Sequence, residues 1–481
     1  MQDSHRQLSF FASNWALTAV IVLTPVLLLA AIPILPTFDD WTSLIAPSFE
    51  PLFTKQRFLF YGYHWRPFDS VFGYIVGLNP KLFFPMLNHI SVVLAHVACT
   101  FLIWTFSTHF QFSSSARNIA TFFYFITPSM LATVLAVDGL NQAYASLWGM
   151  VSLLLYLKVS VCRKYFLWLF AVVIATLCKE NGLMWALITP LVAYAFSKDS
   201  HESLTQLKRH LLAGLLLCIL YALAILLLPS QITIHPEYVP GILKTVKDFL
   251  KFLLTTWITI DYVYLLHAPS RQLLIAVITF LLTLPFFYTL LKGNLKTLIS
   301  KQFIILLLCQ LIAVAPHIFT VFSMMHAYAA LPFAALIIGL LADKKKVNSL
   351  IPFLLFILSA LFINVHLWHE SLKSGQIGKN MARQTLSQCI TPIHNVFLIT
   401  IEDDYPRLSS FCVIPSDAFG WGIAAQYENN YKWPEEIRDT IINRTPDALQ
   451  QAHIIATKKL TSHEADCIWI VNHREVKVVY P

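Results

Sequence analysis

Two adjacent carboxylates, Asp39 and Asp40, follow the first long apolar run of the chain. A carboxylate within hydrogen-bond reach of an attacking hydroxyl or amide can remove its proton, so either residue could serve as a general base. The alternative role is structural, because Asp is a common N-cap residue and Trp41 could open a short helix. The residue pattern supports both roles equally.

Basic side chains that could bind an anion follow in the same region. In His64-Trp65-Arg66-Pro67, a guanidinium able to grip a phosphate or carboxylate with two hydrogen bonds precedes a proline that keeps its backbone extended. Arg66 could instead anchor the chain at a membrane interface with its charge extended into water. His64 and Arg66 are thus candidate substrate contacts, and the anchoring role stays open.

The tetrad Lys179-Glu180-Asn181-Gly182 lies between two apolar runs that are too close together to leave a real loop. Both charges are therefore expected at a membrane edge. Lys179 could face an anionic lipid headgroup while Glu180 orients it or the acceptor. The alternative is an internal ion pair between the two side chains.

Asp138, His326 and Tyr328 complete the candidate substrate contacts. His326 and Tyr328 could bind phosphate or belong to the aromatic and polar belt at the membrane surface. His89 and His96 are seven residues apart and share a helical face, so we expect both to be packed and hydrogen-bonded inside a helix bundle.

No cofactor motif or metal site is predicted, because the sequence contains no CxxC motif and no histidine cluster. Isolated carboxylates leave a divalent-cation requirement open. Cys389, Cys412 and Cys467, near the C-terminus, could form at most one disulfide. The net charge of +8 fits basic cytoplasmic loops, and no nucleic-acid-binding signature accompanies it.

The elements that carry these residues are strongly apolar. The chain is 57% hydrophobic and 12% charged, whereas soluble domains have roughly 45–50% and about 25%. Because a helix needs about 20 apolar residues to cross a membrane, residues 1–368 are predicted to form a mainly α-helical, polytopic bundle of about eleven spans. The runs lie at residues 15–35, 83–107, 118–137, 141–158, 165–178, 183–197, 211–228, 272–291, 302–322, 328–342 and 348–366.

Lys and Arg residues orient the bundle, because they are retained on the cytoplasmic side. They recur at alternate connections, which predicts a cytoplasmic N-terminus and an outward-facing C-terminus. The first outward loop, residues 36–82, then holds the Asp pair and the Arg66 motif. Charges at mid-bilayer are costly and the spans are nearly free of them, so we predict a site at the outer membrane face.

Residues 241–267 are apolar enough to span the membrane but contain charged residues at 244, 247, 248, 251 and 261. A span here would move every later Lys cluster to the outside. We therefore predict an amphipathic helix that lies in the outer interface. The alternative is an ordinary span in a twelve-helix protein.

Residues 369–481 differ in composition, since long apolar runs stop and 13 of the 26 acidic residues lie there. We predict a small extramembrane α/β domain, periplasmic or luminal, that covers the outer site, helps to select the acceptor, or simply stabilises the bundle. Residues 434–443 are predicted as a helix because they open with Pro-Glu-Glu, which is favoured at a helix N-terminus. The predicted strands are residues 396–401, 411–414, 454–457, 467–471 and 476–480.

Several of these motifs occur in a recognisable order. They are Phe38-Asp39-Asp40-Trp41, Trp65-Arg66-Pro67-Phe68, His89 with His96, Thr127-Pro128 and Cys178-Lys179-Glu180-Asn181-Gly182. Their order resembles that of the GT-C superfamily of membrane glycosyltransferases, with the protein O-mannosyltransferases and their bacterial relatives most similar. The likeness covers residues 15–200 and, more loosely, the segment to 366. It departs from the family at Asp138, near which a basic residue is common, and at His326-Ala327-Tyr328, which stands in place of an Arg-Tyr-type motif.

The resemblance implies a hexosyltransferase of the bacterial inner membrane or, alternatively, of the endoplasmic reticulum. Such an enzyme passes a sugar from a polyprenyl-phosphate carrier to a protein, glycan or lipid acceptor at the outer or luminal face, with inversion. By position, Asp39 or Asp40 would be the catalytic carboxylate. Arg66, Lys179 and His326 would face the leaving phosphate, whose growing charge prearranged cations stabilise.

Two other functions stay open. A polymerase or ligase of lipid-linked oligosaccharides would use the same outward-facing site. A lipid or solute transporter is suggested by the many helices, although a transporter would place its site near the midplane, where this chain has few charges.

Overall fold

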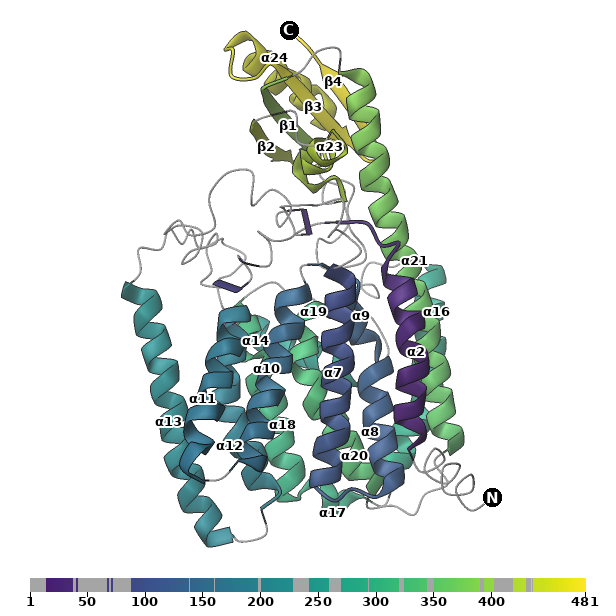
Figure 1. The fold of residues 1–481 in the computed structure, drawn as a ribbon. Coiled ribbons are helices and arrows are strands. Elements are labelled where there is room, and N and C mark those ends of the chain that lie inside the picture. The colour runs from purple at the N-terminus through teal and green to yellow at the C-terminus, as the bar shows by residue number, and fades with distance from the viewer. Residues whose placement is uncertain are drawn as a thin grey trace.

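The computed structural model describes residues 14–37, 40–41, 67–68, 71, 88–137, 139–159, 161–197, 200–227, 242–258, 270–292, 294–319, 324–343, 350–389, 393–401, 418–429, 434 and 436–481. These residues form a bundle of helices with a small sheet domain beyond one end (Figure 1). The bundle contains α2 (Trp15–Ala31), α7 (Asn88–His109), α8 (Ser114–Ile126), α9 (Leu131–Val134), α10 (Gly139–Lys158), α11 (Val161–Cys178), α12 (Trp185–Ala195), α13 (Ser200–Leu227), α14 (Ile242–Trp257), α16 (Ser270–Leu291), α17 (Leu295–Leu298), α18 (Lys301–Val314), α19 (Met324–Ala327), α20 (Leu331–Asp343) and α21 (Leu350–Gln388). Short 3-10 turns connect several of them: η2 (Pro128–Met130), η3 (Glu180–Met184), η5 (Ala315–Phe319) and η6 (Tyr328–Ala330).

The outer surface of the bundle is apolar. On α13, Leu212, Leu216 and Leu220 are 68%, 56% and 55% exposed, although each is a large hydrophobic side chain. Proteins surrounded by water rarely expose contiguous patches of this kind, and such patches mark contact with a membrane or a partner. The surface of α13 therefore suits a helix that faces lipid.

Four helical segments of the described residues are long and apolar enough to cross a membrane: His89–His109, Leu204–Ala224, Met324–Asp343 and Ile351–Gln388. The prediction of a mainly helical chain with membrane-spanning segments agrees with this finding. The finer count of about eleven spans stays a prediction, because it also requires shorter apolar helices such as Trp15–Ala31.

The centre of the bundle is formed by α8 and α20. Every residue of α20 from Leu331 to Leu341 is buried. Gly339 allows the two helices to approach closely, since a Cβ at this position would lie 3.0 Å from the Ala120 Cβ. This packed centre gives the helix ends a rigid support.

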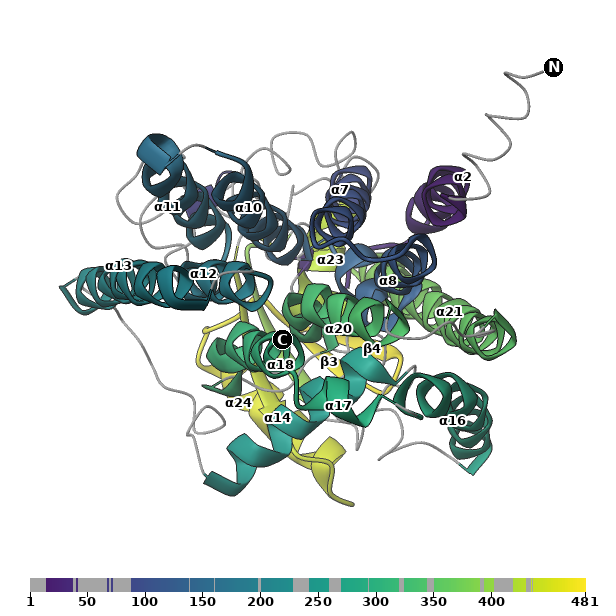
Figure 2. The ribbon, with the colours of Figure 1, turned by 90° about the horizontal axis from the view of Figure 1, so that it is seen from below.

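The segment predicted to lie in the membrane interface forms α14. Its inner face packs through Phe252, which is buried, while Val246, Leu250 and Leu254 are exposed at intervals of four residues. Its 16 residues correspond to only about 24 Å at 1.5 Å per residue. Figure 2 shows α14 from its side among helices that are seen end-on. Both features suit a helix lying along the membrane surface.

Helix α21 links the bundle to the sheet domain. It contains 39 residues, or about 58 Å at 1.5 Å per residue, and continues past the bundle as far as the sheet (Figure 1). The predicted domain boundary between residues 368 and 369 therefore falls inside a helix. Charged residues mark the point at which a helix leaves an apolar environment. The helix itself can continue beyond that point, as α21 does.

The sheet domain contains four strands in the order β2-β1-β3-β4: β1 (Asn395–Ile401), β2 (Glu436–Ile442), β3 (Cys467–Asn472) and β4 (Glu475–Val479). Strand β1 is parallel to β2 and β3, and β4 returns antiparallel to β3. Helix α24 (Ala448–Thr461) covers one face of the sheet, while α21 and α23 (Ile423–Glu428) cover the other. The predicted C-terminal domain with α and β elements is thus present.

Two of the predicted elements of this domain are wrong. Residues 434–443 were predicted as a helix, but Glu436–Ile442 is strand β2, because it pairs along its whole length with β1 and tertiary pairing overrides a local helix signal. Residues 454–457 were predicted as a strand but lie in α24, where Ala448, Ala452, Ala456 and Leu460 form a buried stripe with a spacing of four. The strands predicted at 396–401, 467–471 and 476–480 match β1, β3 and β4, and residues 411–414 lie outside the described residues.

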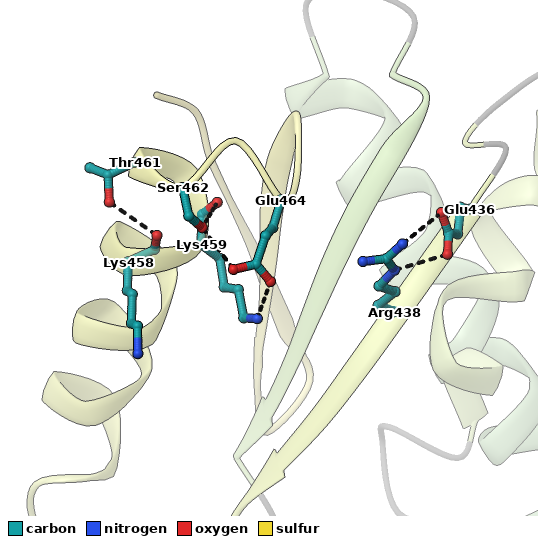
Figure 3. A network of polar contacts seen from close by, with 7 residues as sticks. All are labelled: Glu436, Arg438, Lys458, Lys459, Thr461, Ser462 and Glu464. Atoms are coloured by element: carbon teal, nitrogen blue, oxygen red, sulfur yellow. Dashed lines mark hydrogen bonds and ion pairs between the residues drawn. The ribbon is translucent and has the colours of Figure 1, made fainter.

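Exposed ion pairs lie on the α24 side of the sheet (Figure 3). Arg438 Nε donates to Glu436 Oε1 at 2.9 Å, and Lys459 pairs with Glu464, which also accepts from Ser462 Oγ at 2.9 Å. Exposed pairs of this kind contribute little to stability, about 0–1 kcal/mol at the median. We therefore assign them no role in the candidate site.

Candidate functional site

The predicted site residues divide into two groups. Four of them lie outside the described residues: Asp39, His64, Arg66 and Asp138. Five are described: Asp40, Lys179, Glu180, His326 and Tyr328. Three helix segments near these residues lie at the end of the bundle nearer the sheet domain (Figure 1). They are the end of α11, the start of α10, and α19.

Asp40 closes a turn that begins at Thr37. Its Oδ2 accepts a hydrogen bond from the Thr37 backbone N–H at 3.2 Å, and its own N–H donates to the Thr37 carbonyl at 3.1 Å. A carboxylate that reaches back three residues to an N-cap N–H is one half of a capping box. This contact differs from the predicted one, because Asp40 reaches back to Thr37 from the third position after it, whereas the predicted role was an N-cap of a helix that begins at Trp41. This bond uses Oδ2 of a side chain that is only 4% exposed.

Lys179 lies where the chain leaves α11 in an extended conformation and folds back as η3. Its Nζ donates to Asn141 Oδ1 at 3.3 Å, and the residue is 2% exposed. Gly182 permits the close return, since a Cβ there would lie 2.3 Å from the Ala175 carbonyl oxygen. Glu180, half-buried, opens η3. The Lys-Glu-Asn-Gly tetrad therefore holds an ammonium group inside the end of the bundle.

Buried amides beside this lysine were not predicted from the sequence. Gln142 is 0% exposed, yet neither atom of its amide has a hydrogen-bond partner among the described residues. Asn181 Oδ1 is also buried and is without a partner in the described part of the chain. Leaving a buried polar group unsatisfied costs about 1–3 kcal/mol. The only sequence signal was an Asn-Gln pair at the start of the apolar run 141–158.

His326 stacks on a second histidine that the sequence did not single out. The rings of His317 in η5 and His326 in α19 are 4.1 Å apart with an angle of 6° between their planes. The ring of Phe252, from α14, lies 6.3 Å from that of His317. Helix α14 thus packs beside the histidine pair.

Tyr328 lies deeper than predicted. Its hydroxyl is 3.0 Å from His96 Nδ1 and 3.1 Å from the Tyr124 hydroxyl, and all three side chains are 0% exposed. His89 Nε2 is 3.3 Å from the Ile34 carbonyl oxygen. The prediction that His89 and His96 are packed and hydrogen-bonded is confirmed. Tyr328 thus belongs to a hydrogen-bonded group with His96 and Tyr124 in the interior of the bundle, and its role as a ligand contact stays a prediction.

The amides, the lysine and the histidine pair belong to one region, because η3 contacts both α10 and η5, and α10 contacts α19. We call this set the polar cluster. It consists of Asn141, Gln142, Lys179, Asn181, His317 and His326. Asp40 is tied to the same end of the bundle, since its neighbour Trp41 shares one apolar cluster with Val137, which lies just before α10.

No protein-family model matches this chain, and no curated protein is significantly similar to it. The resemblance to membrane glycosyltransferases therefore depends on the sequence motifs alone.

The polar cluster is chemically suited to an anion that carries hydroxyl groups. A buried ammonium attracts phosphate, and amide side chains donate to and accept from hydroxyls. Among the described residues, no group of three or more His, Cys, Asp and Glu side chains is arranged to hold a metal ion.

Proposed function

We propose that this protein transfers a sugar from a polyprenyl-phosphate-linked donor to an acceptor, at the end of the helix bundle that carries the sheet domain. The observation that carries the proposal is the buried Lys179 ammonium within the polar cluster. A buried charge is expensive, costing several kcal/mol, and such groups in membrane proteins usually serve function.

The donor has two parts, and the bundle offers a place for each. The polyprenyl chain is apolar and would lie against the exposed leucines of the outer helices. Its phosphate and sugar would lie at the polar cluster, where the amide groups of Gln142 and Asn181 can pair with sugar hydroxyls. Helix α14 packs beside the histidine pair through Phe252, and it would lie in the membrane interface between these two parts of the donor.

The proposed reaction is a single displacement. Asp40 or Asp39 removes the proton of the acceptor hydroxyl or amide, and the acceptor atom attacks the anomeric carbon. The bond from that carbon to the phosphate oxygen breaks, so that polyprenyl phosphate leaves with the bonding electrons. Lys179, with Arg66 and His326 as further candidates, stabilises the charge that develops on the leaving phosphate. Attack from the opposite side inverts the anomeric configuration.

The proposed topology has about eleven spans, a cytoplasmic N-terminus and a C-terminal domain on the periplasmic side of a bacterial inner membrane. The endoplasmic reticulum lumen is the equivalent alternative. The Lys and Arg pattern supports this orientation. Successive helices run back and forth between the two ends of the bundle (Figure 1), as a multi-span topology requires. The acceptor would then be a protein, glycan or lipid of the cell envelope.

The test replaces the two carboxylates in turn. Asp39→Asn and Asp40→Asn keep an oxygen acceptor of the same size, so Asn at residue 40 can still accept from the Thr37 N–H and hold the turn. At least one variant should insert and fold normally yet lose sugar transfer from polyprenyl-phosphate hexoses. Wild-type activity in both variants would contradict the assignment of the base. Consumption of diphosphate-linked oligosaccharides alone would identify a polymerase or ligase instead.

A further inference from the structure

Trp41 joins the first outward loop to the sheet domain. Its side chain is 4% exposed, and its indole N–H donates to the Ala418 carbonyl at 3.1 Å. The ring of Tyr427, in α23, meets the indole edge-on with 5.8 Å between centroids. A loop residue next to a proposed catalytic carboxylate is therefore held by groups more than 370 positions later in the chain.

Gly420 shapes the other wall of this contact. It opens η7 (Gly420–Gly422) with a φ of +58°, which only glycine adopts easily. A Cβ at Gly420 would lie 2.2 Å from the Trp41 Cδ1, so any larger residue would push the indole out. The position is thus built to receive a tryptophan ring.

Helix α21 brings the two partners together. Gly375 and Gly378 are three residues apart and share a helical face. A Cβ at Gly375 would lie 2.7 Å from the Leu35 Cβ, and one at Gly378 would lie 2.1 Å from the Ala418 carbonyl oxygen. The segment after α2 and the segment before α23 therefore both lie directly on α21.

The consequence concerns Asp40. On one side its carboxylate is fixed to Thr37, and on the other its neighbour Trp41 is fixed to Ala418. The same apolar cluster contains Val137, just before the start of α10, which carries Asn141 of the polar cluster. One packed joint thus connects the carboxylate, the sheet domain and the helix that pairs with Lys179.

We propose that the sheet domain is a positioning device for the proposed catalytic carboxylate: by holding Trp41, it sets where Asp40 lies relative to the phosphate site at Lys179. This inference depends on the proposed function. Trp41 touches no reacting atom and acts through its neighbour, so it is a positioning residue. This role differs from covering the site, from selecting the acceptor and from a purely stabilising cap.

The test separates kcat from KM in the full-length protein with a polyprenyl-phosphate hexose as donor. Trp41→Ala should lower kcat by about 100-fold, as expected when a reacting group moves by about 1 Å, while the KM for the donor changes less than about threefold because the phosphate site is intact. Gly420→Ala should lower kcat in the same way by displacing the indole. Since both changes act on one contact, the losses in the double variant should not add.

Trp368→Phe is the matched control. Trp368 also donates its indole N–H to a distant backbone carbonyl, that of Ala30 at 2.7 Å, but this contact joins α21 to α2 and does not involve the sheet domain. The kcat of the Trp368→Phe variant should stay within about twofold of wild type. Thermal unfolding of each variant in detergent shows whether the fold is kept, and Trp41→Phe provides a milder variant if Trp41→Ala does not fold.

Two outcomes would overturn the inference. Unchanged kcat in the folded Trp41 and Gly420 variants would show that the joint does not position the loop. A change confined to acceptor range or acceptor KM would show that the domain selects acceptors instead. Failure of the proposed function is distinguishable, because the wild-type protein would then transfer no sugar or the Asp39→Asn and Asp40→Asn variants would both stay active.

Discussion

At the scale of single residues, the chemistry of a side chain was easier to predict than its surroundings. The sequence indicated two possible roles for the Asp motif, as a general base or as a helix cap. In the structure, Asp40 closes a turn. His89 and His96 were correctly predicted as packed, because their spacing fixed a shared helical face. Gln142 and His317 were missed, since an isolated polar residue in an apolar run gives no spacing signal and its importance depends on helices distant in sequence.

Lys179→Met should weaken donor binding without loss of the fold. Methionine retains the length of the side chain but removes the ammonium group, including its hydrogen bond to Asn141 Oδ1, so thermal unfolding must accompany the kinetics to show that the fold is kept. Loss of a hydrogen bond to a charged group costs about 1.5–3 kcal/mol, which corresponds to a rise of roughly 10- to 150-fold in the KM for a polyprenyl-phosphate hexose. Steady-state kinetics in detergent would measure this change. Lys179→Arg, which keeps the charge, is the control, and an unchanged KM in Lys179→Met would exclude Lys179 from the phosphate site.

Gln142→Leu should make the protein more stable and less active. Its amide has no partner among the described residues, so an apolar side chain of similar size removes a penalty of about 1–3 kcal/mol. The matched control is Gln310→Leu, because buried Gln310 donates to Thr256 Oγ1 at 2.7 Å and accepts from Trp257 Nε1 at 3.2 Å. Thermal unfolding should show opposite shifts for the two variants. Equal destabilisation would mean that Gln142 has a structural partner and is not reserved for a ligand.

At the scale of elements, long apolar helices followed directly from composition, whereas the sheet domain was predicted only in part. Strands β1 and β3 are continuous apolar runs, as expected for strands buried on both faces. Strand β2 has an exposed, charged pattern and lies at the sheet edge, so its identity depends on pairing with β1. Residues 454–457 resemble a strand by themselves, and only the alanine stripe around them indicates the helix.

Cys467 should react slowly with alkylating reagents in the folded protein. Burial in strand β3 raises the pKa of its thiol to about 12. A raised pKa keeps the thiol protonated, so only roughly one molecule in ten thousand is a thiolate at pH 8, and the thiolate is the reactive form. Mass spectrometry after iodoacetamide treatment should find Cys467 unmodified in native protein and modified after denaturation. Rapid native labelling would show that this face of β3 opens.

At the scale of the whole molecule, the sequence predicted an apolar helix bundle followed by a small C-terminal domain with α and β elements, and both parts are present. It did not predict that the two parts share a packed joint at Trp41, because contacts between residue 41 and residues 418–427 leave no periodic signal in either segment. The sequence also did not predict that α21 continues across the boundary between residues 368 and 369, for the same reason. Only three-dimensional packing shows that the proposed catalytic loop and the last domain form one unit.

The position of α14 decides the topology of everything after it. If α14 lies in the interface, Lys208 and Lys296, both exposed near helix ends, face the same compartment. Single-cysteine variants Lys208→Cys and Lys296→Cys should then both resist a membrane-impermeant maleimide in intact cells and react after permeabilisation. Leu449→Cys in the sheet domain should react without permeabilisation. Labelling of Lys296→Cys but not Lys208→Cys in intact cells would make α14 a span.

The most direct test of the proposed function is product analysis with purified protein in lipid vesicles, using radiolabelled polyprenyl-phosphate hexoses as donors and a cell-envelope extract as acceptor. The expected result is release of polyprenyl monophosphate in equal amount to the sugar bound covalently to the acceptor, with inverted configuration. The release should be lost in at least one of Asp39→Asn and Asp40→Asn. Movement of the intact donor across the vesicle membrane, with no sugar transferred and no polyprenyl monophosphate formed, would contradict the proposal and identify a transporter.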